Sequence, residues 1–409
     1  MNRPTLSVLI PTFNRCRLLP QSVESVLRQS VPAHQVIVIN DGSTDDTRKV
    51  LEPYSDRIEY IEQENGGKSS ALNAALPRVT GEYVWVFDDD DIAIQDAWEH
   101  HAAVLHRRPD VGFTYGPHYL ARIGDDGRAI GPLQRDIPPD VMEGELFLRL
   151  LERNFMSSQT IFVRTSCYRE LGGWDTSLIR SQDYDMSLRL ARNYCGERVD
   201  QYVCYWRLHE GPRGSISERW TADRSVSKWQ EYDHRIFKKL RADLDLREYL
   251  PRPYKEALPH GIDSRRAYLQ RMAIMLSKGL YEEAAEDWTL AMEATHGEWE
   301  LTQSERDIFR RAGSHAWLPQ FINEQPDHCS RLLRLWKGSI GRVVRQELAH
   351  GLYRQAVAAR RDKGLRAARV AFAAALRVAG LWGAVCSATS RFIWRRRTSM
   401  AARPSKLSA

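Results

Sequence analysis

The sequence predicts an α/β fold in which helices flank a mostly parallel sheet and an all-α C-terminal region follows. Short apolar runs alternate with segments of helical periodicity in the first part of the chain. Turn-forming and acidic residues directly follow several of these runs, and beyond about residue 220 the helical spacing continues without a strand pattern. Strands that alternate with helices form βαβ units, which build parallel sheets.

The first four strands are expected where the chain is continuously apolar. Residues 6–10 (LSVLI) end at Pro11 and predict a buried parallel strand, and 36–39 (VIVI) predicts a second that Asn-Asp-Gly-Ser ends. Shorter runs predict strands over 58–61 and 83–87. The helices expected between and beside these strands lie at 18–27, from about Asp45 or Asp46 onward, and at 69–77.

The pattern is looser after the fourth strand. The further elements expected are helices at 96–107, 144–152 and 184–192, strands at 111–115, 159–163 and 200–208, and a turn at 125–127. Helical spacing then covers 279–293 and 352–379, and Gly279 and Gly351 suggest a loose helical-hairpin repeat. The boundaries we expect are a catalytic α/β domain over 1–225, a helical docking region over 226–330 and a basic helical tail over 331–409.

Composition and charge narrow the class of protein. A chain of 409 residues is too long for one ordinary core, and 43% hydrophobic residues exclude a disordered chain. From Arg331 onward there are 18 Lys and Arg against 2 Asp and Glu. Such a tail favours an anionic membrane surface, and RFIWRRR (391–397) adds apolar side chains to it, although a solvated helical pair is an equal alternative. We expect no nucleic-acid partner, because no motif of that kind is present.

Cysteine usage and hydropathy indicate a cytoplasmic protein, and the basic tail favours a peripheral position at the inner face of the plasma membrane. The six cysteines are scattered without metal-ligand spacing, which is typical of a reducing compartment. The start of the chain has no apolar stretch of the length a signal peptide needs. We also expect no transmembrane helix over 370–385, because Arg377 interrupts it and a central arginine costs about 2.5–3.5 kcal/mol.

The chemically useful residues follow the predicted strands. Pro11 to Asn14 come after the first strand, Asn40 to Ser43 after the second and Asp88 to Asp91 after the fourth. Carboxyl ends of parallel strands meet at one edge of a sheet, where ligands bind. The sequence therefore predicts a site at this edge.

The aspartate quartet is a candidate cation site. Alternation along a strand would direct Asp88 and Asp90 to one side and Asp89 and Asp91 to the other. A bound hard cation would offset the repulsion of four adjacent charges. The alternative is a solvated acidic turn before the next helix.

A second constellation lies at 172–192 (GGWDTSLIRSQDYDMSLRLAR). Asp183 and Asp185 stand where a loop becomes a helix, so either is a candidate general base or a simple helix cap. His209 follows a strand and alone suggests a structural histidine. The pair His100 and His101 is expected at the surface of a helix.

Six segments in this order resemble the inverting family 2 glycosyltransferases, which have the GT-A fold. The segments are SVLIPTFNR (7–15), VIVINDGSTDDT (36–47), NGGKSSALNAAL (65–76), GEYVWVFDDDD (81–91), GGWDTSLIRSQDYDMSLRLA (172–191) and RLHEGPRGSIS (207–217). The resemblance covers about half of the chain and ends near residue 225. It implies a transfer of one sugar from a nucleotide-sugar to an acceptor hydroxyl.

The resemblance also implies roles for the matching residues. Asp183 falls at the general-base position, and Asp90 with His209 would hold Mn²⁺ or Mg²⁺. The candidate donor-binding residues are Pro11, Thr12, Phe13, Asn14, Asp41, Lys68, Asp88 and Asp89, with Lys68 as a phosphate contact or, equally, a solvated lysine. Family members usually have Glu where this chain has Gln182. The Gln-x-x-Arg-Trp motif of processive members is absent apart from Arg-Trp (219–220), so we expect single-sugar transfer.

The expected partners follow from this resemblance. The donor would be a nucleotide-sugar, a UDP-sugar by preference, and the acceptor a glycan or a lipid-linked molecule of cell-envelope or surface-polysaccharide synthesis. A catalytically inactive sugar-binding scaffold is the non-enzyme alternative. A nucleotidyltransferase is the third interpretation, although NGGKS (65–69) stands too late for its phosphate loop.

Overall fold

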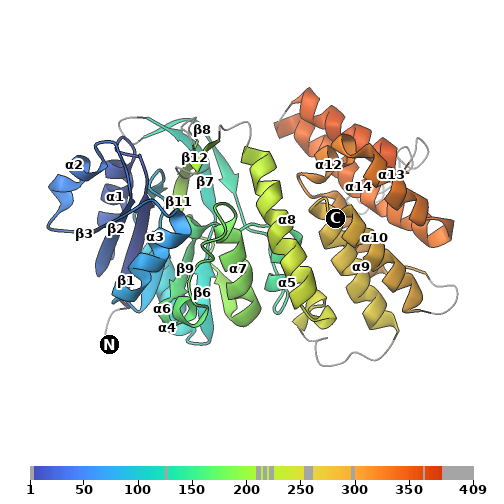
Figure 1. Cartoon of the computed structure of the whole chain (residues 1–409), viewed down its shortest axis with the longest axis horizontal. Helices are drawn as coiled ribbons and strands as arrows, with labels where there is room; N and C mark the ends of the chain where they lie inside the picture. Colours follow the sequence, from blue (N-terminus) through green and yellow to red (C-terminus); the bar gives the residue numbers. More distant parts are fainter. Residues whose placement is uncertain are drawn as a thin grey trace, which may run out of the picture. The chain divides into compact units, whose positions relative to one another are not determined.

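The computed structural model describes residues 4–124, 128–208, 213–214, 219–220, 225–252, 261–295, 300–362 and 364–379. The chain forms two compact units, Met1–Asp233 and His234–Ala409. Figure 1 colours the first unit from blue to yellow-green and the second from there to red. The boundary falls inside helix α8 (Ser225–Asp243). The three-part division expected from the sequence stays a prediction.

A seven-stranded sheet forms the centre of the first unit. Its strands, in spatial order, are β10 (Cys195–Arg198), β6 (Val111–Tyr115), β9 (Ile161–Arg164), β4 (Tyr83–Val86), β1 (Leu6–Thr12), β2 (Gln35–Asp41) and β3 (Glu59–Gln63). Neighbours pair in parallel, except that β9 runs antiparallel to both β4 and β6. The predicted mostly parallel sheet is therefore confirmed.

The helices of this unit cover the sheet with apolar side chains. They are α1 (Leu19–Leu27), α2 (Thr47–Leu51), α3 (Lys68–Ala75), α4 (Ala97–Arg107), α5 (Leu146–Glu152), α6 (Thr165–Glu170) and α7 (Gln182–Asn193). Alternate residues of β1, such as Val8 and Ile10, share one buried cluster with Val23 of α1 and Trp98 of α4. Burial of this continuous apolar surface is what drives the strands and helices together.

A smaller sheet beside the first was only partly predicted. It contains β5 (Ile92–Ala93), β11 (Cys204–Arg207), β7 (His118–Ile123) and β8 (Ala129–Asp136), in that order. The sequence predicted β11 but not the β7–β8 hairpin, whose second strand is largely exposed and does not alternate cleanly. The predicted turn at 125–127 lies outside the described residues. A short pair, β12 (Arg213–Gly214) and β13 (Arg219–Trp220), completes the strands described.

The second unit is helical throughout the part that the structure describes, as the sequence predicted. Its helices after α8 are α9 (Ile262–Ser277), α10 (Tyr281–Glu293), α11 (Gln303–Gly313), α12 (Leu318–Glu324), α13 (Pro326–Leu335) and α14 (Gly338–Asp362), and residues 365–379 are also helical. No helix among the described residues is long and apolar enough to cross a membrane.

The expected hairpin boundary at Gly351 is wrong, because α14 continues through this residue. A Cβ at Gly351 would lie 2.4 Å from the carbonyl oxygen of Arg310, and one at Gly313 would lie 2.1 Å from that of Leu348. Gly351 is therefore required by the close contact of α11 with α14, and it does not end a helix. At Gly279 one helix does end and the next begins, since this residue has a φ of 75° between α9 and α10.

The expectation that His101 lies at the surface is also wrong, and it leads to a testable pH dependence. His101 is fully buried, its Nδ1 lies 2.8 Å from Thr114 Oγ1, and burial lowers its pKa to about 3. Between pH 6.5 and 3 the unfolded chain takes up a proton on this ring that the folded chain does not. The free energy of unfolding should therefore fall as the pH decreases through this window.

Urea unfolding at pH 7 and pH 5 measures this effect. We expect the wild-type protein to lose about 2 kcal/mol more than His101→Gln over this range, because about 1.4 kcal/mol is lost per pH unit below pH 6.5. His100→Gln, at the half-exposed neighbouring position, is the control and should keep the wild-type slope. Equal losses in wild type and His101→Gln would contradict the assignment.

Candidate active site

A cavity of about 250 Å³ opens at the carboxyl ends of β1, β2 and β4. Residues from eight separate segments of the first unit line it. They are Pro11, Thr12, Phe13, Arg15, Asp41, Asn65, Gly67, Lys68, Asp88, Asp89, Asp90, Ser157, Gln159, Ile179, Arg180, Ser181, Gln182, Asp183, Trp206 and Trp229. The acids that follow the fourth strand and Asp183 therefore lie around the same space.

Asn14 is a predicted site residue that does not line the cavity. Its backbone is left-handed, with a φ of 53°, and its N–H donates to Ser43 Oγ at 2.9 Å. Its side-chain oxygen accepts from the N–H of Thr44 at 2.8 Å. Asn14 thus links the loop that follows β1 to the loop that follows β2.

Asp41 organises the glycine loop before α3. Each of its carboxylate oxygens accepts two hydrogen bonds, from Gln63 and the Gly66 N–H on Oδ1, and from Asn65 and the Gly67 N–H on Oδ2, all at 2.7–2.9 Å. Gly67 precedes α3 with a φ of 85°, which favours glycine. The backbone of this loop is therefore held fixed where the cavity meets α3.

The aspartate quartet differs from the alternation that the sequence predicted. β4 ends at Val86, and the quartet forms a turn in which the Asp91 N–H donates to the Asp88 carbonyl at 3.3 Å. Carboxylate oxygens of Asp88, Asp90 and Asp91 come within 4.8 Å of one another, and Asp89 is not part of this group. Grouping Asp91 with Asp89 was wrong, because side chains alternate only while the chain remains extended.

Burial changes the acidity of two members of the quartet. Desolvation, followed by the charge of Asp90, raises the pKa of Asp89 to about 7. The same causes raise the pKa of Asp91 well above its usual range. One oxygen of Asp91 accepts from the Arg207 N–H at 2.8 Å, and the other is buried without a hydrogen-bond partner among the described residues. An orphaned carboxylate oxygen of this kind suits a cation.

Lys68 lies among the acids, and its side chain is 24% exposed. Its Nζ is 2.5 Å from Asp88 Oδ1 and 3.5 Å from Ser158 Oγ. Burial lowers the pKa of Lys68, but the charges of Asp88 and Asp183 outweigh this effect and raise it above its ordinary value. Lys68 is therefore a fixed cation between the acids that follow β4 and those of α7.

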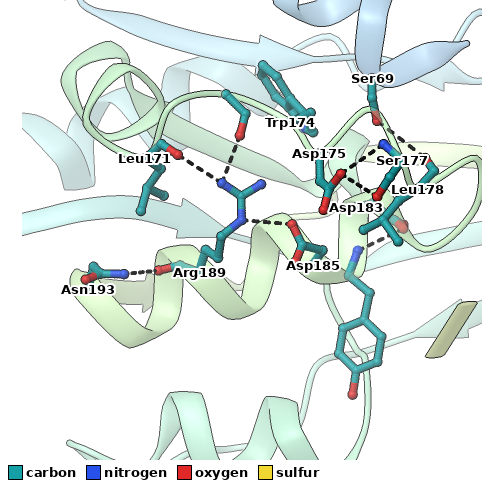
Figure 2. Close-up of polar contacts among 12 residues, drawn as sticks. Ser69, Leu171, Trp174, Asp175, Ser177, Leu178, Asp183, Asp185, Arg189 and Asn193 are labelled. Atoms are coloured by element: carbon teal, nitrogen blue, oxygen red, sulfur yellow. Dashed lines mark hydrogen bonds and ion pairs between the residues drawn. The ribbon is translucent and has the colours of Figure 1, made fainter. Parts of the chain in front are cut away.

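Asp183 and Asp185 differ in their surroundings, which the sequence left open. Asp185 accepts from Arg189 at 2.8 Å, and Arg189 also donates to the carbonyl oxygens of Leu171 and Gly173 (Figure 2). Asp183 lines the cavity in the first turn of α7, and its Oδ1 accepts from the Tyr184 N–H at 2.9 Å. Asp185 is a structural partner, and Asp183 is the carboxylate that faces the site.

Several lining residues were missed from the sequence. Arg15 has its Nε 3.9 Å from Asp90 Oδ2, and Arg180 lies over the ring of Trp229 at 4.9 Å. Arg15 directly follows the Pro-Thr-Phe-Asn segment, which was a usable signal, whereas Trp229 has no local signal. His209, predicted as a metal ligand, lies outside the described residues.

Residues 7–167 match the glycosyl transferase family 2 profile. The first unit contains a glycosyltransferase family 2 domain. The matched segment runs from β1 into α6 and contains the aspartate quartet and Lys68. The cavity extends beyond the matched segment, because Asp183 and Trp229 also line it.

Relatives of the family 2 domain are found among bacterial proteins. It is 28% identical over 192 residues to an uncharacterized glycosyltransferase of Rickettsia felis. The aligned segment makes up 46% of this chain and 32% of that protein. It is also 28% identical over 223 residues to a chondroitin synthase of Escherichia coli, 53% of this chain and 30% of that protein. The chain therefore matches about a third of the length of these relatives.

Solved structures were also compared. The S. aureus TarS 1–349 structure in complex with UDP-GlcNAc covers 90% of this chain and 90% of its own, with a TM-score of 0.47 and 18% identity.

Proposed function

We propose that the family 2 domain transfers one sugar from a nucleotide-sugar donor to an acceptor hydroxyl with inversion of the anomeric carbon. The observation that carries this proposal is the shared cavity, in which Asp183 faces the space bordered by Asp88, Asp90 and Lys68. A diphosphate leaving group needs neutralisation and the acceptor hydroxyl needs a base, and the cavity offers groups for both.

The donor is held at the end of the cavity built by β1, β2 and α3. Pro11, Thr12 and Phe13 line this end beside Asp41 and the fixed glycine loop. Peptide groups and an aromatic ring are suited to a nucleoside, and a uridine diphosphate sugar is our preferred donor. Lys68 and Arg15 supply positive charge to the diphosphate.

The acidic group fits a divalent cation, Mn²⁺ or Mg²⁺. Three carboxylates supply the hard oxygen ligands that these ions prefer. The Oδ2 atom of Asp91 is buried and accepts no hydrogen bond from the described residues, so a cation could use it as a ligand. Asp90 and Asp88 would hold the ion with Asp91, and His209 stays a proposed ligand. When bound, the cation neutralises the charge that develops on the leaving diphosphate.

Asp183 acts as the general base. It lies in the first turn of α7 and is close enough to Lys68 to raise the pKa of that amine. Its carboxylate takes the proton of the acceptor hydroxyl as the oxygen attacks the anomeric carbon from the face opposite the diphosphate. Asp183 is then protonated, the glycosidic bond is formed and the nucleoside diphosphate leaves.

A binding screen followed by turnover tests this proposal. Thermal unfolding is recorded with UDP, GDP, CDP and ADP, each with and without Mn²⁺, and we expect one diphosphate to raise the melting temperature only when the metal is present. The matching nucleotide-sugars are then assayed for donor hydrolysis and sugar transfer. Binding without turnover would favour the inactive scaffold, and release of pyrophosphate from a nucleoside triphosphate would favour the nucleotidyltransferase.

The acceptor proposal is a glycan or lipid-linked molecule of the cell envelope, with the enzyme peripheral at the cytoplasmic face of the membrane. Support comes from the described part of the basic tail. Leu365 and Phe372 are 61% and 42% exposed, beside exposed Arg366 and Arg369. Apolar side chains next to arginines suit an anionic lipid surface. The cluster at 391–397 lies outside the described residues.

Vesicle sedimentation tests the membrane proposal. Removing all of 331–409 would also remove α14, which packs closely on α11, so charge reversal is a sharper change. We expect Arg366→Glu with Arg369→Glu to lower binding to vesicles of phosphatidylglycerol and phosphatidylethanolamine by about 30-fold or more, because the loss of two basic residues costs about 2 kcal/mol at about 1 kcal/mol per residue. Reversal of the exposed Arg28, the residue that follows α1, to glutamate is the control. Unchanged binding of the tail variant would refute the proposal.

A further inference from the structure

Helix α8 contacts the loop that leads into α7, the helix that contains the proposed base. Trp229 and Asp233 are four residues apart, so they lie on the same face of this helix. Asp233 Oδ1 accepts a hydrogen bond from the Ser181 hydroxyl at 2.8 Å, and the Trp229 ring lies under the guanidinium of Arg180. One face of α8 therefore contacts two consecutive residues just before Asp183.

Ser181 has an unusual backbone at this contact. Its φ of 58° and ψ of 17° are left-handed, a conformation that costs free energy for any residue with a Cβ. The side chain is 5% exposed and does not cap α7, although it occupies the N-cap position. A serine hydroxyl that would ordinarily cap the helix is directed to Asp233 instead. The hydrogen bond to α8 thus helps to hold the turn from which α7 begins.

The direction in which α7 starts determines where Asp183 lies. Asp183 is the second residue of α7, so a small rotation of the Ser181 peptide moves its carboxylate by a comparable amount. The beginning of this loop is fixed separately. Asn73 of α3 exchanges two hydrogen bonds of 2.8 Å with the backbone of Trp174. α8 supplies the constraint on the residues that directly precede Asp183, whereas Tyr184, which follows it, is held by its hydroxyl donating to the Leu150 carbonyl at 2.6 Å.

We propose that Asp233 is a positioning residue for Asp183, acting through Ser181, and that α8 is a functional part of the active site. Asp233 does not line the cavity, whereas Trp229 does. The segment matching the family profile ends at residue 167 and does not include α8. This inference rests on the proposed function of Asp183 as the base.

The experiment compares four variants in a donor-hydrolysis assay with Mn²⁺ and the nucleotide-sugar selected by the thermal screen. They are Asp233→Ala, Asp233→Asn, Ser181→Ala and the double variant with both alanines. We expect each alanine variant to lower kcat by about tenfold or more, because misplacement by about 1 Å can cost about 100-fold. KM for the donor and the Kd for the nucleoside diphosphate should stay within about twofold, because a positioning residue does not contact the donor.

The remaining variants separate positioning from loss of folding. Asp233→Asn keeps an oxygen that accepts from Ser181, so it should retain kcat near the wild-type value. The double variant should be no slower than the slower single variant, because both changes remove the same bond. The inference is overturned if Asp233→Ala keeps wild-type kcat, if Asp233→Asn is as slow as Asp233→Ala, or if the two single effects multiply. Failure of the wild-type protein to turn over any donor would instead overturn the proposed function.

Discussion

Replacing Asp183 by asparagine is expected to reduce the rate of sugar transfer by about 10²–10⁴-fold, the usual contribution of a general base. The amide keeps the size of the side chain and still accepts a hydrogen bond, but it cannot take a proton. Because the proposed role of Asp183 is to contact the acceptor hydroxyl and not the nucleotide, the Kd for the nucleoside diphosphate should change little. Steady-state kinetics with a calorimetric titration of the nucleotide measures both quantities.

Asp185→Asn is the matched control for this experiment. It changes the same group in the same helical turn, but Asp185 is paired with Arg189. The loss of the Asp185 charge weakens the pair with Arg189, which holds the loop at 171–173. We therefore expect the transfer rate to fall by only a few-fold. Wild-type transfer by Asp183→Asn, or an equal loss in both variants, would show that Asp183 is not the base.

Replacing Asp90 by asparagine is expected to lower the transfer rate by about 10²–10³-fold, the range seen when one electrostatic stabiliser of a transition state is removed. Asp90 contributes to the acidic group with Asp88 and Asp91 and lies near Arg15. Its neutralisation removes a proposed ligand, so the Mn²⁺ concentration that gives half-maximal activity should also rise. Metal titrations of activity and of nucleotide binding measure the change.

Asp96→Asn provides the comparison for Asp90. Asp96 also follows the fourth strand, but its side chain is 52% exposed and it is paired with His100 away from the cavity. This variant should keep the wild-type metal dependence. A metal response of Asp90→Asn that matches the wild type would exclude Asp90 as a ligand.

The predicted α/β fold and the place of the site depended on properties that are local in the sequence. Continuous apolar runs marked β1, β2 and β4, and parallel strands put the residues that follow them at one edge. The buried position of His101 also had a local signal. It shares a helical stripe with Ala97, Trp98 and Leu105, which are all buried, and that periodicity outweighs the polarity of the ring.

Other features depended on contacts between distant segments. The grouping of Asp91 with Asp88 and Asp90 follows from the turn after Val86, and the alternation rule does not apply there. The separate surroundings of Asp183 and Asp185 depend on where Arg189 meets the loop at 171–173. Trp229 and Asp233 belong to a helix whose amphipathic pattern gives no sign of an active site. Such residues become visible only when the tertiary structure is known.

The position of the unit boundary inside α8 has a practical consequence for recombinant work. A fragment cut where the family profile ends, at residue 167, would lack the proposed base. One cut at residue 225 would retain Asp183 but lose the partner of Ser181. An expression fragment intended to represent the catalytic half should therefore continue at least to Asp243, the last residue of α8.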